Sequence, residues 1–237
     1  MFDRKVTENK ATCYPQYGTV STCFMICFCI CFIIFSAGCG SKLLHRENPV
    51  GKLATIEVVD VSQEPEQVDI SASTPFVMKI IHGSLSVTPK AKYHIAAMIV
   101  GVREYSSGWN SQISPADLAL AWGGLAAMDY DTYIEYEQRG RWYYYKFNKM
   151  SPFDKRYIGS HSANNHIIPA TDNIKNIIAK LQVKQIVALE GYLVNVDGVY
   201  EGEKVWWHSS LTREDSGDGA CELMYVNKIV VNGLVYE

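Results

Sequence analysis

The stretch QIVALEGYLVNVDGVYEGEKVWWHSSL, residues 185–211, predicts two antiparallel strands joined by a tight turn. Apolar, β-branched and aromatic residues dominate both halves, 185–196 and 199–211, as is typical of strands that pack in a sheet. Asp197 and Gly198 lie between the halves, and an Asp-Gly pair favours the two-residue turn of a β-hairpin. We therefore expect the chain to turn at Asp197–Gly198.

The same composition recurs along the rest of the chain. Further strands are expected at 53–61, 76–89 (with a kink at Gly83), 92–105 and 220–236, and two more on either side of an Arg139-Gly140 turn within 133–147. The polar segment 62–75, which holds two prolines, predicts a loop. Many strands with few helices indicate an α+β fold dominated by antiparallel sheet.

Two short helices are expected. Ser114 can cap a helix that runs to about residue 122, Pro115 suits its first position, and Leu118 and Trp122 then recur at helical spacing. Residues 172–182 predict the second helix, because their isoleucines fall on one face.

Composition and charge are typical of a folded globular chain. The 237 residues are 48% hydrophobic and 20% charged, with a net charge of −3. Residues 1–39 carry a net charge of +1, so residues 40–237 carry −4. An acidic body lacks the basic surface that binds the phosphate backbone, and we expect no nucleic-acid partner.

The uncharged run VSTCFMICFCICFIIFSAG, Val20–Gly38, predicts a membrane anchor. As a helix it would reach roughly 28 Å, about the thickness of the hydrocarbon core of a bilayer. The chain is therefore divided into a leader (1–19), the apolar segment (20–38), a tether (39–53) and a single globular β-rich domain (54–237).

Two forms of anchor fit this segment. One is a helix that stays in the membrane, and the other is a lipoprotein signal. Phe35-Ser36-Ala37-Gly38-Cys39 resembles a bacterial lipobox, in which the cysteine is cut and acylated, although Ser36 stands where leucine is usual. Either form predicts attachment to a bacterial cell membrane by residues 20–38 or by Cys39, with the domain exported. Lysine and arginine flank both ends of the segment, so charge specifies orientation only weakly.

Cysteine usage is uneven. Six of the seven cysteines lie within residues 1–39, and Cys221 lies beyond them. A lone cysteine predicts no disulfide within the folded domain and a free thiol at Cys221. The alternating Cys27, Cys29 and Cys31 lack the paired spacing of a zinc site, and we expect neither a metal nor a cofactor.

The stretch GSHSANNHIIPATDNI, residues 159–174, concentrates polar side chains, including His161, His166, Asn164 and Asn165. Its core NHIIPA approaches the pattern of HNH endonucleases, but Asn165 stands where that pattern needs an acid. The alternatives are a polar loop that supports itself and a loop that binds a ligand. In the first, side chains satisfy the loop backbone and Thr171 or Asp172 caps the following helix.

A second polar stretch, WWHSSLTREDSGDGACE, spans residues 206–222. Combined with the first, it suggests catalytic candidates for a hydrolase or a metal-dependent enzyme: His161, His166, His208, Asp215 and Cys221. No complete motif supports such a centre, since neither serine has the small neighbours of a nucleophile elbow. The other interpretation is a polar turn between two strands, with Arg213 pairing an acid.

Tyrosine and tryptophan crowd the segment from Tyr130 to Tyr145. Cross-strand packing accounts for about half of these rings. Successive side chains of a strand point to opposite faces, so the others face outward and can stack on a sugar, a peptide or a lipid headgroup. The binding candidates are Tyr133, Tyr136, Trp142, Tyr144, Asn164, Asn165 and Arg213.

Residues from about 76 to 226 resemble a family of bacterial membrane-anchored proteins that has no established activity. The segments that carry the resemblance are ISPADLALAWGGLA, DYDTYIEYEQRGRWYYYKF, HSANNHIIPA, IVALEGYLVNV and SSLTREDSGDGACELMYV. The resemblance implies a single N-terminal anchor and transfers no catalytic residue. IVALEGYLVNV and the hairpin after it also resemble small five-stranded barrels that bind oligonucleotides or oligosaccharides.

These features together predict a membrane-anchored envelope protein that binds a ligand or assembles with a partner and is not an enzyme. An envelope protein or a glycan is the expected partner, and the sequence leaves the oligomeric state open. The alternative is the hydrolase or metal-dependent enzyme built from the five catalytic candidates.

Overall fold

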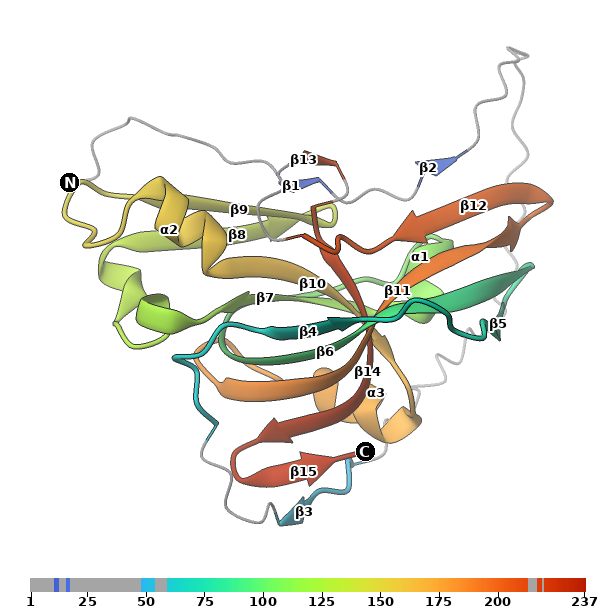
Figure 1. Ribbon diagram of the computed structural model, residues 1–237, viewed down its shortest axis with the longest axis horizontal. Coiled ribbons are helices and arrows are strands. Elements are labelled where there is room, and N and C mark those ends of the chain that lie inside the picture. Colours follow the sequence, from blue (N-terminus) through green and yellow to red (C-terminus); the bar gives the residue numbers. More distant parts are fainter. Residues whose placement is uncertain (1–10, 13–15, 18–47, 54–58, 213–216, 219) are drawn as a thin grey trace, which may run out of the picture.

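The computed structural model describes residues 11–12, 16–17, 48–53, 59–212, 217–218 and 220–237. Strands dominate this part of the chain and its helices are few and short (Figure 1). Most strand pairs are antiparallel. The predicted α+β class with mainly antiparallel sheet is therefore confirmed.

Five strands pair in a closed ring. They are β6 (Gly83–Glu104), β7 (Ala116–Ala121), β10 (Ser162–Pro169), β14 (Glu222–Val231) and β11 (Ile186–Tyr200). Each pairs with the next, and β11 returns to β6. The β10–β14 pair is parallel and the other four pairs are antiparallel.

Apolar side chains fill the ring. Leu118 and Leu120 of β7 meet side chains from β6, β11 and β14 there, and all are buried. Helix α3 (Asp172–Ile178) adds its isoleucines to the same cluster. The Thr171 hydroxyl accepts a hydrogen bond from the Ile174 amide at 3.2 Å, so this predicted helix and its cap are confirmed.

Strands β6 and β11 extend beyond the ring and form an arm. There β12 (Glu203–His208) pairs with β11, and β5 (Phe76–Ile80) pairs with β6. The short helix α1 (Trp109–Ile113) contributes Trp109 to a second apolar cluster with Trp207 of β12.

A hairpin inserted between β7 and β10 forms a second layer, together with helix α2 (Lys155–Ser160). Its strands are β8 (Ile134–Arg139) and β9 (Trp142–Phe147), and the turn at Gly140 and Arg141 has φ of 58° and 69°. The predicted hairpin is confirmed, although its turn lies one residue later than the predicted Arg139-Gly140, because Arg139 still pairs with Trp142. A third apolar cluster joins this layer to the outward side chains of β6 and β7.

The remaining elements are short. They are β1 (Ala11–Thr12), β2 (Gln16–Tyr17), β3 (Lys52–Leu53), β4 (Glu66–Asp69), β13 (Gly217–Asp218), β15 (Leu234–Tyr236) and the 3₁₀ turns η1 (Gly123–Leu125) and η2 (Tyr130–Thr132). The predicted loop at 62–75 therefore contains a strand. Of the strand predicted at 53–61, residues 54–58 lie outside the described part.

The turn predicted at Asp197–Gly198 is wrong, because β11 continues through it and the chain turns at Glu201 and Gly202. Both predicted turn residues pair with β6 and β12. A Cβ at Gly198 would collide with the Ser84 carbonyl oxygen, so close approach between strands explains this glycine. Similarly, 76–89 is not one kinked strand, because the chain turns before Gly83.

The helix predicted from Ser114 is also wrong, because residues 116–121 form strand β7. Every residue of β7 is buried, since Leu118 and Leu120 face the ring interior while Ala119 and Ala121 lie under the inserted layer. A strand buried on both faces lacks polar alternation, so its period cannot be separated from that of a helix.

The polar stretch at 159–171 is not a loop. Residues 155–160 form α2 and residues 162–169 form β10, a ring strand. Its polar side chains are typical of a loop, but here they are buried and bond to partners inside the protein. The fold therefore holds three α-helices among the described residues, where two were predicted.

No helix among the described residues is long and apolar enough to cross a membrane. The apolar segment 20–38 and Cys39 lie outside the described part. Strands β1 and β2 precede this segment in the chain, and they pair with β9, β13 and β12 of the body.

A chain that begins at Asn48 should fold, because the ring uses strands from residue 83 onward. We expect this shortened chain to show the far-UV circular dichroism spectrum of the full chain and to unfold cooperatively on heating. A chain that ends at Ala220 loses β14, which opens the ring, and it should not fold. An unfolded 48–237 chain would show that residues 1–47, which hold the other six cysteines, are needed for folding.

Candidate functional site

His166 lies in a buried network, away from solvent. Its Nδ1 is 2.8 Å from Oδ1 of Asp117, and the same oxygen accepts from Nη1 of Arg141 at 2.5 Å. The side chains of His166 and Asp117 are 0% exposed and that of Arg141 is 4% exposed. Arg141 also donates to the Ser114 carbonyl oxygen, so the hairpin turn is bonded to β7 through Asp117 and to the segment just before β7 through Ser114.

Two groups of this network have shifted pKa values. Burial by itself would raise the pKa of Asp117, but the neighbouring His166 and Arg141 outweigh burial and lower it. Burial and the Asp117 charge raise the pKa of Tyr105 to about 12. The Tyr105 ring lies 3.8 Å from the Arg141 guanidinium carbon, so the buried cation has an aromatic face beside it.

The two polar stretches of the sequence meet where β10 runs beside β14. Asn165 pairs with Glu222 in the ladder, and Nδ2 of Asn164 is 3.9 Å from Sγ of Cys221. Gln138 of the hairpin donates to Oδ1 of Asn164 at 2.7 Å. Asn164 therefore joins the hairpin layer to the ring, whereas the side chain of Asn165 donates only to the Ala163 carbonyl oxygen of its own strand; both side chains are buried and do not form a binding surface.

The predicted free thiol at Cys221 is wrong. Cys221 is disulfide-bonded, and its partner lies outside the described residues. The prediction failed because it considered only cysteines within the folded domain. A disulfide sulfur has no thiolate to act as a nucleophile.

The other two candidate histidines have local partners. His161 stacks on Tyr157 with ring centroids 3.8 Å apart, and its Nε2 lies 3.1 Å from Glu64. His208 is exposed on the arm, and its Nε2 lies 3.0 Å from Asp197. Asp215 and Arg213 lie outside the described residues.

The described residues therefore do not bring His161, His166 and His208 into one centre. Each bonds to a different carboxylate on a different element. No group of three His, Cys, Asp or Glu in the described ranges is placed to hold a metal ion. The enzyme built from the five candidates stays a prediction, with Asp215 untested.

The tyrosine hairpin has two faces. Its inward face buries Tyr143 and Tyr145 and half-buries Tyr136. Trp142 and Tyr144 alternate with the buried tyrosines, so they point outward, and their ring planes are 13° apart with centroids at 6.1 Å. Tyr133 packs against the apolar cluster beneath the hairpin. Of the predicted aromatic candidates, Trp142 and Tyr144 thus form a half-exposed pair.

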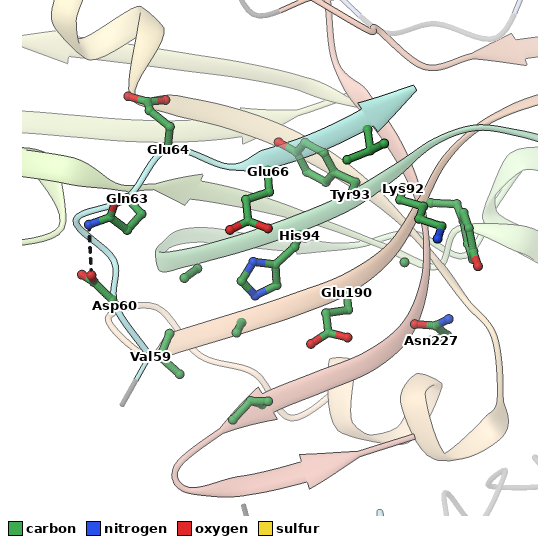
Figure 2. Close-up of a pocket in the computed structure, with 16 residues that line it drawn as sticks. Val59, Asp60, Gln63, Glu64, Glu66, Lys92, Tyr93, His94, Glu190 and Asn227 are labelled. Atoms are coloured by element: carbon green, nitrogen blue, oxygen red, sulfur yellow. Dashed lines mark hydrogen bonds between the residues drawn. The ribbon is translucent and has the colours of Figure 1, made fainter. Parts of the chain in front are cut away.

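A groove of about 700 Å³ lies on the outer face of β6, β11 and β14, with β4 and residues 59–64 as its wall (Figure 2). One row of cross-strand partners crosses it, namely Glu66 of β4, His94 of β6 and Glu190 of β11, and the row continues outside the groove lining to Lys228 of β14. Directly opposed residues of antiparallel strands share a face. Figure 2 shows Glu66, His94 and Glu190 pointing into the groove together.

Small side chains form the groove floor. Ala96, Ala188 and Val230 are register partners that pack in one apolar cluster with Val59. Sequence reasoning missed this site entirely. Its residues are scattered from 59 to 230, and only the register between strands brings them together. Their one sequence signal is the alternation of small and polar residues in strands β6 and β11.

No known family matches the chain, and neither the curated proteins nor the solved structures include a match. The site must therefore be interpreted from its own geometry.

Asp117→Asn should destabilise the fold by about 3–5 kcal/mol, because Arg141 would then be buried without its counter-ion. The folded pKa of Asp117 lies below its ordinary value of 3.8, so the network stabilises the protein above pH 3.8. That stabilisation is lost as the pH falls through the folded pKa. Urea unfolding at several pH values measures both effects.

Asp197→Asn is the matched control, since it removes a carboxylate from the exposed pair with His208. It should change the unfolding free energy by less than about 1 kcal/mol. If Asp117→Asn costs no more than this control, the buried network does not hold the hairpin.

Proposed function

We propose that this protein is a non-enzymatic binding module of the bacterial cell envelope, held at the membrane by residues 20–38 or by an acylated Cys39. Its ligand is a glycan, which stacks on the outward rings of Trp142 and Tyr144. The observation that carries this proposal is the parallel alignment of these two rings on the outer face of the hairpin.

The order of strands in the ring supports a barrel of the oligonucleotide/oligosaccharide-binding type. If the ring strands are numbered in chain order, their order around the ring is first, second, third, fifth, fourth, and the fourth pairs with the first again. Helix α3 lies in the chain between the third and the fourth strand. Such barrels bind ligands on the face of their second and third strands. Here these strands are β7 and β10, and the inserted hairpin covers them.

The hairpin that covers this face has Trp142 and Tyr144 half-exposed on its own outer face. Trp142 and Tyr144 lie two residues apart on β9, and their rings stack nearly parallel, with the Arg139 guanidinium 5.1 Å from the centre of the Tyr144 ring. Arg139 and Glu137 are their cross-strand partners on β8. Planar rings bordered by a donor and an acceptor suit a sugar, whose apolar face stacks while its hydroxyls form hydrogen bonds.

Two further features favour a glycan and binding without catalysis. The negative charge of the body disfavours nucleic acid, the other ligand of such barrels. Within the described ranges, the buried Asp–His pair of Asp117 and His166 is 0% exposed, so no substrate reaches it.

The proposed anchor has a structural consequence. A helix that spans the membrane once between residues 20 and 38 would separate β1 and β2 from the body. Cleavage before Cys39 would remove both strands. The pairings of β1 with β9 and of β2 with β12 therefore oppose this part of the proposal.

Trp142→Ala and Tyr144→Ala should each weaken glycan binding by about 1 kcal/mol, because each removes one stacking ring. The probe is a soluble β-1,4-linked N-acetylglucosamine oligomer titrated into the full chain in detergent. Calorimetry measures the affinity, and changes in NMR signals locate the site.

Trp206→Ala is the matched control, because Trp206 is 43% exposed but lies on the arm. It should leave the affinity unchanged. Equal losses in all three variants, or no binding of the oligomer by the parent protein, would reject the platform.

Intact-mass measurement of the membrane-extracted protein tests the anchor. A mature chain that begins at a lipid-modified Cys39 identifies a lipoprotein, and a full-length chain identifies a spanning helix. Full-length protein that stays soluble without detergent would contradict both.

A further inference from the structure

We propose that the groove on the outer face of β6, β11 and β14 binds a linear aliphatic polyamine. This site is separate from the aromatic platform on the hairpin, and its observations are independent of the glycan proposal. The argument rests on the charge, the spacing and the floor of the groove.

Carboxylates dominate the charge of the groove. Asp60, Glu66 and Glu190 line it, and Lys92 is the only lysine or arginine among the described residues that do. The side chain of Glu66 is exposed and forms no ion pair or hydrogen bond with the rest of the described chain. Glu190 is paired with Lys228 at 2.7 Å along the same row. The groove therefore complements a cation.

The carboxylates are too far apart for a single small cation. Glu66 and Glu190 are register partners of His94 from opposite sides, so two strand spacings, roughly 10 Å, separate their backbones. No trio of ligands within the described ranges converges on a metal position. Glu190 already has the Lys228 ammonium group at 2.7 Å, so Asp60 and Glu66 are the carboxylates that separate positive charges of a ligand would neutralise.

The floor suits the chain that joins those charges. Ala96 and Ala188 are 9% and 8% exposed, and with Val230 they make a shallow apolar strip beside the acidic row. Methylene groups gain by leaving water on such a strip, while ammonium groups stay at its polar border. A volume of about 700 Å³ is in the range of small-molecule sites.

The acidic end of the groove is already ordered. The Ser62 amide donates to Oδ1 of Asp60 at 2.9 Å, and Gln63 donates to Oδ2 at 3.1 Å. Figure 2 shows the second of these bonds at the edge of the groove. The Asp60 carboxylate is therefore held in place before a ligand arrives.

Calorimetry of the full chain with spermidine at low ionic strength tests the proposal. We expect saturable one-to-one binding that Glu66→Gln weakens by about two- to fivefold. Lys92→Gln should tighten binding by a similar factor, because it removes the opposing charge. Because n-butylamine has one amine group, it should bind at least about fivefold more weakly than spermidine.

Glu135→Gln, on the exposed face of the hairpin, is the matched control and should leave spermidine affinity unchanged. Trp142→Ala should also leave it unchanged, so failure of the glycan platform is distinguishable from failure of this site. Absence of saturable binding, equal affinity in Glu66→Gln, or weaker binding in Lys92→Gln would each overturn the proposal.

Discussion

The pairing of β14 on both sides is the constraint on which the rest of this structure depends. It runs parallel to β10 and antiparallel to β11, and these two ladders close the ring. An open ring would leave the backbone groups of two strand edges without partners. Beyond the closed ring, β6 and β11 continue as an arm. The register of the ring strands also aligns Glu66, His94, Glu190 and Lys228.

The inserted hairpin is held to this ring by both apolar and polar contacts. Its tyrosines pack on the alanines of β7, while Arg141 reaches Asp117 through the layer. Burying one charged pair costs free energy, and here His166, Ser114 and the Tyr105 ring offset that cost. This arrangement orients the hairpin, so that its outward rings form a defined surface.

Two surfaces with different chemistry follow from that architecture. The hairpin presents flat aromatic rings beside a donor and an acceptor, and the opposite part of the ring presents an acidic groove with an apolar floor. His94 lies between Glu66 and Glu190 in the groove, and Arg139 pairs with Glu137 on the hairpin, so both surfaces carry charge as well as apolar area, and both lie on paired strands.

Local sequence determined the α+β class, the 133–147 hairpin, the helix that Thr171 caps and the strands at 220–236, because each depends on neighbouring residues. Only the tertiary structure decided that residues 116–121 are a strand, that Asp197–Gly198 lies inside a ladder and that HSANNHIIP is buried. The physical reason is burial by distant partners. Arg141 offsets the free-energy cost of burying the Asp117 carboxylate. The register of β11 on β6 brings the groove residues together from distant parts of the chain.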